Sequence, residues 1–295
     1  MKKYIVVTGG AGFIGSNLIE YLISKTNYKI ISLDNYSSGS KKNHIHNKKV
    51  KYINGDTNDI NKKLKKYKDQ IIVIFHFGEF ARIHQSFIDT EQCFYSNISG
   101  TSKVFYFCVK NKIKIIYSAT SASLGNKGSD QNLSPYAFTK SKNLNLLERL
   151  KKWFNQPYEA LYFYNVYGPR QIKKGFMATV IGIFEDQFEK KISLSVVRPG
   201  TQSRKFTHVQ DTIEGCYFAW KKNKNRHYSL SNSKSYRIID VAKMFSNKVK
   251  MIPSKLGERM QSATVKKIGK IKIYSLPCSR NLKNYIIDFK HNMLK

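Results

Sequence analysis

Acidic residues, cysteine, arginine and long apolar segments are all scarce in this chain of 295 residues. Asp and Glu number 19 against 52 Lys and Arg, so the formal net charge at pH 7 is +33. No apolar stretch approaches the roughly 20 residues of a membrane-spanning helix. The apolar run after the first lysines is short and ends in glycines. We therefore expect a soluble, cytoplasmic protein without a membrane partner.

The four cysteines are widely spaced and form no Cys-x-x-Cys pair, which argues against a disulfide framework or a zinc site and fits a reducing compartment. His44 and His46 form a His-x-His in a polar loop without a nearby carboxylate or thiol, so we expect no metal. Arginine supplies only 9 of the 52 basic residues, and the 43 lysines are spread along the chain. Nucleic-acid recognition uses arginine heavily, so a nucleic-acid partner is not expected, although the positive field would attract anionic small molecules.

Strand-like and helix-like segments alternate through the first half of the chain, which predicts a parallel sheet covered by helices. The expected strands are KYIVVTG, YKIISLD, VKYING, QIIVIFHFG, IKIIYSAT and YEALYFYNVYG, and a long helix is expected over 136–154. From about residue 168 the alternation becomes irregular. We therefore predict an α/β fold with a doubly wound parallel sheet over 1–167 and a smaller C-terminal α/β substrate lobe over 168–295, from which some segments could return to the first domain.

A glycine-rich loop follows the first expected strand and opens a helix. Its Gly9, Gly12 and Gly15 permit a tight turn and a close approach of a pyrophosphate to the backbone. Asp34 ends the second strand, about twenty residues further on, where a carboxylate accepts both ribose hydroxyls and repels a 2′-phosphate. This combination predicts a Rossmann-type domain that binds NAD rather than NADP. Asp56, after the third strand, fits a contact with adenine or, equally, a helix cap.

Tyr136 and Lys140 are four residues apart, so a helix places them one turn apart on one face. A free tyrosine, with a pKa near 10, is a poor base at neutral pH, and lowering that pKa by about three units takes about 4 kcal/mol. A neighbouring ammonium group together with a positively charged nicotinamide can supply this. In isolation the pair would be an ordinary surface feature; beside the glycine loop and Asp34 it becomes a candidate acid–base couple.

A set of motifs in chain order resembles the extended short-chain dehydrogenases/reductases, and within them the nucleotide-sugar epimerases of the UDP-glucose 4-epimerase type. The motifs are TGGAGFIG, LDNYSSG, GD, HFGE, SNISGT, the Thr120 region, YAFTK, YNVYGPRQ and SRKFTHVQD, and they span essentially the whole chain. The resemblance implies a catalytic set of Thr120, Tyr136 and Lys140. It implies cofactor contacts from Gly9, Gly12, Phe13, Ile14, Gly15, Asp34, Asn35, Asp56, Thr57, Phe77, Gly78, Asn97, Tyr136 and Lys140. It also implies substrate contacts from Thr120, Asn165, Arg204 and Lys255, and a homodimer formed through the helices that hold 94–109 and 136–154.

The chain departs from the family pattern at several places. Family members with dehydratase activity carry Asp-Glu after the catalytic Thr, whereas Ser121 and Ala122 follow Thr120 here, which disfavours 4,6-dehydration. The loop between Thr120 and Tyr136 is shorter than usual. The small residues that the family places after the fourth strand are replaced by a segment containing Glu79, Arg82 and His84. These three side chains would face the sugar, with Glu79 as a substrate contact, or else belong to a solvated loop.

We predict NAD-dependent epimerisation of a nucleotide-diphosphate sugar at C4, by transient oxidation to a keto-sugar and return of the hydride. Two enzyme alternatives remain open: a 4-oxidoreductase that releases the keto-sugar, and a 6-epimerase of the ADP-heptose type. Lys174 matches a lysine of the second alternative, but Asp34 argues against it because those enzymes commonly prefer NADP. A catalytically idle NAD-binding regulator is the alternative outside the enzyme class.

Overall fold

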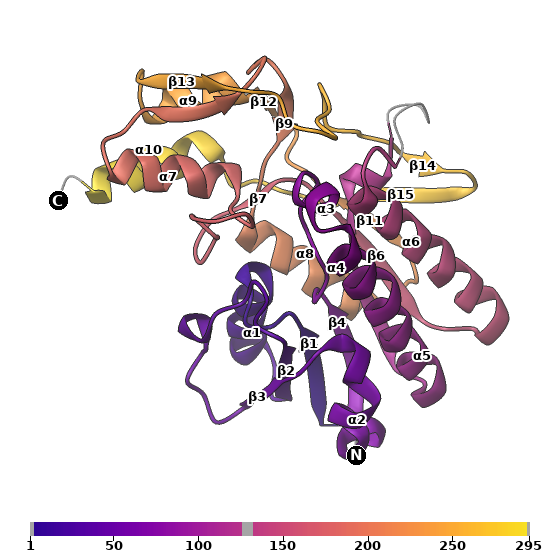
Figure 1. Ribbon diagram of the computed structural model, residues 1–295. Coiled ribbons are helices and arrows are strands. Elements are labelled where there is room, and N and C mark those ends of the chain that lie inside the picture. The colour runs from indigo at the N-terminus through magenta and orange to yellow at the C-terminus, as the bar shows by residue number, and fades with distance from the viewer. Residues whose placement is uncertain (1–2, 126–131, 294–295) are drawn as a thin grey trace.

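A nine-stranded sheet forms the centre of the computed structural model, which describes residues 3–125 and 132–293 (Figure 1). The strand order is β14-β15-β11-β6-β5-β4-β1-β2-β3, and all neighbouring pairs are parallel except β14 with β15. The predicted α/β class with a Rossmann-type, doubly wound sheet is thereby confirmed. The strands are β1 (Tyr4–Thr8), β2 (Lys29–Asp34), β3 (Val50–Asn54), β4 (Ile71–His76), β5 (Lys114–Thr120), β6 (Tyr158–Phe163), β11 (His227–Leu230), β14 (Lys267–Ile268) and β15 (Ile271–Ser275).

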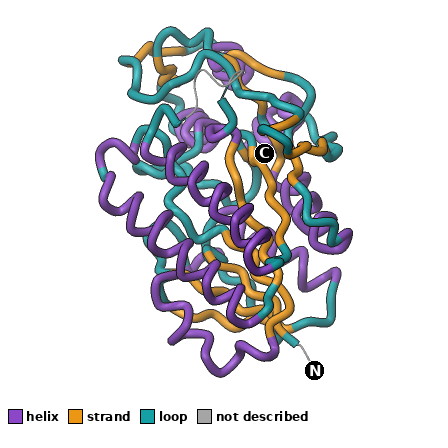
Figure 2. Tube along the Cα trace, turned by 90° about the vertical axis from the view of Figure 1, so that its right-hand side faces the viewer, coloured by secondary structure: helices purple, strands orange, loops and turns teal. Residues whose placement is uncertain are grey.

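Helices cover both faces of the sheet (Figures 1 and 2). One face packs against α1 (Phe13–Lys25) and α8 (Val209–Lys222), and the other against α2 (Ile60–Leu64), α5 (Thr101–Asn111) and α6 (Pro135–Phe154). Because both faces are buried, the central strands are near-continuous apolar runs instead of alternating ones. This explains why the first six strands could be recognised from sequence.

Helix α6 carries the Tyr–Lys pair, and its start is fixed by local chemistry. The Ser134 hydroxyl accepts a hydrogen bond from the Ala137 N–H at 3.1 Å, and Pro135 occupies the first helical position. The helix therefore begins one residue before the predicted start and ends, as predicted, at Phe154. Tyr136 and Lys140 lie in its first two turns.

The helix expected after β4 is continuous but contains a wider turn. It consists of α4 (Thr90–Phe94), the π-helical segment η4 (Tyr95–Gly100) and α5. Such π turns are often found at functional sites. Shorter elements complete this part of the chain: α3 (Gln85–Ile88), η1 (Lys41–Asn43), η2 (Thr57–Asp59), η3 (Lys65–Gln70) and η5 (Ser121–Ser123).

A second core lies in the C-terminal lobe, above the carboxyl edge of the sheet in Figure 1. Its buried aromatics include Phe184, Phe206 and Phe245. Beyond residue 168, α8, β11 and β15 pack on or pair with the main sheet, so the chain crosses between the two parts more than once. The elements of the lobe are α7 (Val180–Glu189), α9 (Ile238–Phe245), α10 (Leu282–Met293), β8 (Leu194–Val197) paired with β13 (Val249–Ile252), and β9 (Ser203–Lys205) paired with β12 (Ser235–Arg237); β7 (Val166–Tyr167) and β10 (Thr207–His208) connect it to the sheet.

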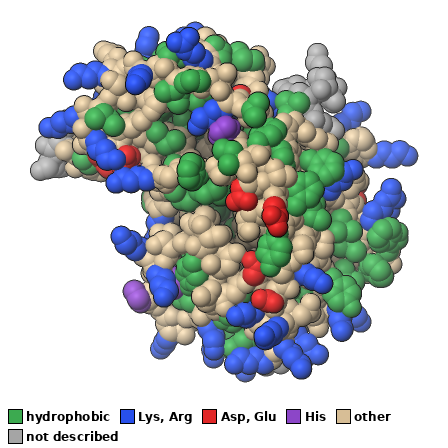
Figure 3. Space-filling view, in the orientation of Figure 1, with side chains coloured by type: hydrophobic (Ala, Val, Ile, Leu, Met, Phe, Trp, Pro, Cys, Tyr) green, Lys and Arg blue, Asp and Glu red, His purple; other side chains and the backbone are tan. Residues whose placement is uncertain are grey.

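Basic side chains lie around the rim of the visible face instead of forming a single stripe, and the surface is hollowed between the sheet and the C-terminal lobe (Figure 3). Within the described ranges, no helix is both long enough and apolar enough to cross a membrane. The shortened loop after Thr120 includes residues 126–131, which lie outside the described residues.

Candidate active site

A cavity of about 370 Å³ opens at the carboxyl ends of the central strands. This edge is where open α/β sheets bind their ligands. The cavity is lined by most of the predicted cofactor contacts, namely Gly9, Gly12, Phe13, Ile14, Gly15, Asp34, Asn35, Thr57, Phe77, Gly78, Tyr136 and Lys140. The glycine loop, Asp34 and the Tyr–Lys pair therefore share one cavity.

The glycine loop is shaped so that backbone, and not side chains, faces the cavity. Gly9 has φ +68°, and a Cβ there would lie 2.9 Å from the Gly78 nitrogen. A Cβ on Gly15 would lie only 2.1 Å from the Gly9 oxygen. Helix α1 begins at Phe13 with Gly12 as its N-cap and without a side-chain cap, so its first N–H groups and its positive dipole end remain available to an anion. The residues present fit the pyrophosphate of a dinucleotide.

Asp34 is tied to the same loop. Its carboxylate accepts the Ala11 N–H and the Tyr36 N–H, both at 2.8 Å. Burial raises the pKa of Asp34, and these two hydrogen bonds act in the opposite direction. Each carboxylate oxygen has a further lone pair, which leaves acceptor sites for ribose hydroxyls.

Asp56 has the second of the two roles that the sequence allowed. It caps η2 by accepting the Asn58 N–H at 2.8 Å, and it also accepts a hydrogen bond from Asn35 at 2.8 Å. Thr57, and not Asp56, is among the residues that line the cavity. The cap leaves a further lone pair on each carboxylate oxygen, so the predicted contact of Asp56 with the cofactor remains a prediction beside this capping role.

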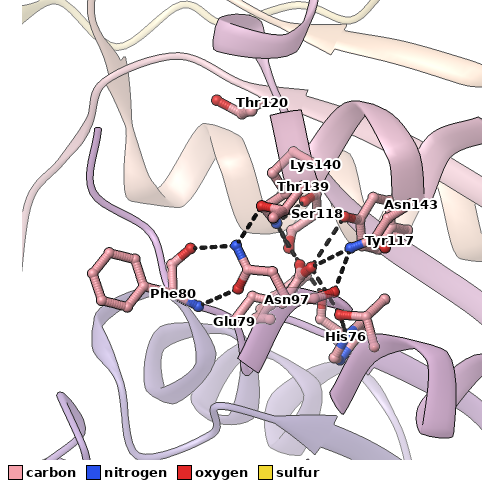
Figure 4. A network of polar contacts seen from close by, with 12 residues as sticks. His76, Glu79, Phe80, Asn97, Tyr117, Ser118, Thr120, Thr139, Lys140 and Asn143 are labelled. Carbon is pink, nitrogen blue, oxygen red and sulfur yellow. Dashed lines mark hydrogen bonds and ion pairs between the residues drawn. The ribbon is translucent and has the colours of Figure 1, made fainter. Parts of the chain in front are cut away.

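Lys140 is buried in a polar network (Figure 4). Its ammonium donates to the Ser118 carbonyl at 2.6 Å and forms an ion pair with Glu79. The two side chains are only 3% and 1% exposed. The lysine is therefore fixed between β5 and the loop after β4, beside the cavity.

The Glu79 carboxylate collects three more donors from three other elements. Thr101 of α5 donates at 2.9 Å, Tyr117 of β5 at 3.1 Å and Asn143 of α6 at 3.1 Å (Figure 4). Burial, followed by the charge of Glu79, raises the pKa of Tyr117 well above its ordinary value, so this phenol remains a donor. Four converging donors suit an ionised carboxylate, which only accepts. Glu79 also lines the cavity, although its carboxylate is directed toward Lys140, and its predicted contact with the substrate remains a prediction.

Asn97 holds the loop after β4 in place. It is fully buried in η4 and forms two hydrogen bonds with the Phe80 backbone. Its side-chain amide accepts from the Phe80 N–H at 2.7 Å and donates to the Phe80 carbonyl at 3.0 Å. A further bond to the Thr139 hydroxyl, at 3.1 Å, joins it to α6. Asn97 thus fixes the loop after β4 and is not among the described residues that line the cavity, and its predicted contact with the cofactor remains a prediction.

Thr120 ends β5 and lies apart from the Glu79 network (Figure 4). Its hydroxyl accepts the Ala122 N–H at 3.2 Å and so caps η5. Ser118 and Ala119 line the cavity, whereas Thr120, among the described residues, does not. Its predicted contact with the substrate remains a prediction.

The residues expected at the substrate diphosphate lie at the junction with the C-terminal lobe, outside the cavity lining. Asn165 donates to the Lys205 carbonyl at 2.9 Å, Arg204 lies 3.4 Å from the Glu258 carboxylate, and Lys255 is exposed in the loop after β13. Arg259 was not identified from the sequence. It donates to the carbonyls of the loop after β5, at 2.7 Å to Ala122, and its charge lowers the pKa of Arg204 further after burial has done so.

Two other side chains singled out by the sequence can now be placed. Lys174 is 70% exposed and lies 3.3 Å from Asp186 on α7, as expected of an ordinary surface lysine. Arg82, in contrast, lines the cavity close to Tyr136. His84 is the N-cap residue of α3 and is partly buried.

The fold and the site together define a dinucleotide-binding enzyme of the short-chain dehydrogenase type, with a Tyr–Lys pair beside the glycine-loop cavity. The family model for the NAD dependent epimerase/dehydratase family matches residues 5–231. The chain belongs to this family, and its cofactor is NAD.

Relatives indicate the range of activities in this family. A putative UDP-glucose 4-epimerase from Methanocaldococcus jannaschii is 32% identical over 231 residues, which cover 74% of either chain. An ADP-L-glycero-D-manno-heptose-6-epimerase from Brachyspira hyodysenteriae is 27% identical over 81% of this chain and 79% of its own. Among solved structures, the UDP-N-acetylglucosamine 4-epimerase from Methanobrevibacter ruminantium in complex with UDP-N-acetylmuramic acid has a TM-score of 0.84 and 27% identity, covering 100% of this chain and 98% of that one. The relatives in this family thus include epimerases that are described as acting at different carbons of nucleotide sugars.

Proposed function

We propose that the protein epimerises a nucleotide-diphosphate sugar at C4 by transient oxidation to the 4-keto-sugar, without net redox change. The observation that carries the proposal is that Tyr136 and Lys140 line the same cavity as the glycine loop and Asp34. A sugar held between them would present its hydroxyl to Tyr136 while the carbon that bears it lies beside the nicotinamide. The two relatives described as 4-epimerases support the choice of carbon.

The chemistry that NAD supplies when bound is reversible acceptance of hydride from the sugar carbon. Tyr136 would accept the proton of the reacting hydroxyl and later return it. The ammonium of Lys140 would stabilise the phenolate form of Tyr136, and Glu79 with the Ser118 carbonyl holds that ammonium in place. Thr120 would orient the reacting sugar oxygen.

The residues after Thr120 restrict the reactions open to the keto-sugar. Ser121 and Ala122 offer no carboxyl group, so no acid is placed there to assist loss of water. Their backbone carbonyls instead accept hydrogen bonds from Arg259. With the keto-sugar unable to dehydrate, turning it in the cavity and reducing its other face gives epimerisation.

The substrate diphosphate would lie between the sheet and the C-terminal lobe. Arg204 and Arg259 are close enough to interact electrostatically there, and two neighbouring guanidinium groups favour a polyanion between them. Asn165 and Lys255 flank this position. Placing the diphosphate here directs the sugar toward Tyr136.

A relative described as a 6-epimerase supports the 6-epimerase alternative. However, the lysine that this alternative requires does not lie at the cavity. Lys174 is largely exposed and paired with Asp186. The 4-oxidoreductase alternative is separated by experiment, because it accumulates NADH in proportion to product whereas an epimerase does not.

We also expect a cytoplasmic homodimer. Exposed aromatic side chains lie along the helices predicted to pair, including Phe94, Tyr95 and Tyr106, and hydrophobic side chains gather on that side of the molecule (Figure 3). Light scattering of the wild type should give twice the mass of one chain. Tyr106→Glu should reduce the measured mass to that of a single chain. A wild-type monomer at micromolar concentration would overturn this expectation.

The proposed chemistry is tested by Tyr136→Phe, with Tyr28→Phe, at an exposed tyrosine just before β2, as the matched control. Both proteins are incubated with NAD and a panel of UDP-, GDP-, ADP- and CDP-sugars. Loss of the Tyr136 hydroxyl should lower turnover by about 10² to 10⁴-fold, the usual contribution of a general acid–base group, while NAD binding persists. Turnover unchanged by Tyr136→Phe, or an idle wild type, would contradict the proposal.

A further inference from the structure

Arg82 is a cation in the cavity wall that forms no ion pair with any described carboxylate. Its Nε and Nη2 both donate to the Met177 carbonyl, with the Nε bond at 2.9 Å, and Nη1 donates to the Ala81 carbonyl at 2.7 Å. A guanidinium has five N–H groups, so one on each terminal nitrogen remains without a protein acceptor in the described structure. The side chain is positioned by the protein, but its charge is not neutralised by it.

The charges of four other arginines are neutralised by acidic side chains of the protein. Arg170, Arg204, Arg237 and Arg280 each form an ion pair with Glu or Asp. Removing a cation from water is costly unless an anion accompanies it. Arg82 is partly buried, and this burial lowers its pKa, so its charge is incompletely hydrated and has no protein counter-charge among the described residues. A ligand anion would supply the missing compensation.

The position of Arg82 indicates which part of the ligand carries that anion. Arg82 and Tyr136 line the same cavity, and the charge of an ionised Tyr136 would stabilise the Arg82 cation, so the two groups are within electrostatic reach. Tyr136 acts at the reacting sugar carbon. The diphosphate has its own pair of cations, Arg204 and Arg259, at the C-terminal lobe. The anion facing Arg82 is therefore on the sugar.

The segment that carries Arg82 is firmly held. Two bonds from Asn97 clamp the Phe80 backbone, and the Ser86 hydroxyl accepts the Tyr136 N–H at 3.2 Å, which joins the end of the segment to the start of α6. The guanidinium is thus preorganised, as a specific binding contact requires.

We propose that Arg82 binds a carboxylate on the sugar, so that the substrate is a nucleotide-diphosphate sugar with an acidic hexose, such as a uronic acid. This assignment rests on the proposed function, because it takes Tyr136 to mark the reacting carbon. The planar, bidentate guanidinium matches a carboxylate and discriminates against a neutral hydroxymethyl group at the same ring position.

The test compares UDP-glucuronic acid with UDP-glucose, which differ only in the acidic group. The wild type should prefer UDP-glucuronic acid in kcat/KM. Arg82→Met, which keeps length but removes the charge, should lower kcat/KM for UDP-glucuronic acid by roughly 10 to 100-fold, the value of a charge-assisted hydrogen bond. The same substitution should change kcat/KM for UDP-glucose by no more than about 3-fold, and Arg82→Lys should retain part of the preference. Thermal melting and NAD titration verify that both variants fold.

Binding measured without turnover separates this inference from the proposed function. Calorimetric titration of NAD-loaded Tyr136→Phe with each sugar nucleotide should show tighter binding of UDP-glucuronic acid, abolished by adding Arg82→Met. If this preference is present but the wild type turns over neither sugar, the epimerase proposal fails and the Arg82 assignment stands. The assignment would be overturned if Arg82→Met lost kcat/KM equally for both sugar nucleotides. It would also be overturned if the wild type bound UDP-glucose more tightly, or bound both compounds equally. Neither outcome would affect the Tyr136 test.

Discussion

Glu79 and Lys140 form an ion pair that is almost completely shielded from water, with the glutamate in the loop after β4 and the lysine on α6. Both side chains also bond to β5, Glu79 through Tyr117 and Lys140 through the Ser118 carbonyl. The pair thus joins three elements at the point where the proposed proton transfer occurs. Glu79 acts as a positioning residue for Lys140.

Breaking this pair should destabilise the protein strongly. Glu79→Gln leaves a buried ammonium without its counter-charge, which typically costs about 3 to 5 kcal/mol. The measurement is urea unfolding, with Glu20→Gln as control, because the Glu20 pair with Arg170 is exposed and worth at most about 1 kcal/mol. We also expect kcat to fall, since Lys140 would no longer be fixed beside Tyr136.

The double variant Glu79→Gln/Lys140→Met distinguishes a coupled pair from two independent residues. Removing both charges should leave the protein more stable than the sum of the two single changes predicts. Additive losses, or a Glu79→Gln protein that unfolds like wild type, would show that the ion pair is not what holds this region together.

Asp34 should determine the choice of cofactor. Asp34→Asn removes the charge that repels a 2′-phosphate and weakens acceptance of two ribose hydroxyls. Affinity for NAD should fall by roughly tenfold, as expected for loss of a charged hydrogen-bond acceptor. The ratio of the NADP to the NAD dissociation constant should also decrease, and fluorescence titration measures both dissociation constants. Asp56→Asn retains a capping side chain, so it should change neither dissociation constant. An equal effect of the Asp34 and Asp56 substitutions would refute the assignment of cofactor choice to Asp34.

Buried histidines should make the protein less stable as the pH falls. Burial lowers the pKa of His76 to about 4 and that of His227 to about 4, against about 6.5 in the unfolded chain. Between these values the unfolded chain binds more protons, so the unfolding free energy decreases from pH 7 toward pH 4. Each histidine should account for about 2 kcal/mol of loss at pH 5.

His227 offers a clean measurement because it lies on β11, where the Tyr158 and Tyr162 hydroxyls contact its ring, both at 2.9 Å. His227→Gln keeps hydrogen-bonding groups there but cannot titrate. Urea unfolding at pH 7 and pH 5 measures how much unfolding free energy each protein loses on acidification. The variant should lose about 2 kcal/mol less than the wild type. Carboxyl groups whose pKa is raised by burial, such as Glu185, act in the opposite direction but cancel in this difference. Identical losses of unfolding free energy in the wild type and in His227→Gln would contradict the prediction.

The sequence was most informative where local chemistry decides the structure. Buried parallel strands are continuous apolar runs, Ser134 and Pro135 mark the start of α6, and the glycines of the first loop are required by contacts that a Cβ would block. These signals are local, so they could be recognised without knowledge of the fold. They placed Asp34, Tyr136 and Lys140 at the cavity.

The roles of Glu79 and Asn97 could not be predicted in the same way. The partners of Glu79 come from three different elements, and whether its carboxylate faces the cavity or the interior depends on how those elements pack. Arg259 was missed for a related reason. It lies in an irregular part of the C-terminal lobe, where no periodic pattern indicates that it reaches the loop after β5.

Transient oxidation at C4 can be tested directly with a nucleotide sugar that carries deuterium at C4. The proposed mechanism predicts a slowed reaction with this substrate, and an inverted product that retains the deuterium at C4 without uptake of hydrogen from the solvent. Product with solvent hydrogen at C4, or inversion at C6 with no isotope effect from C4, would contradict it.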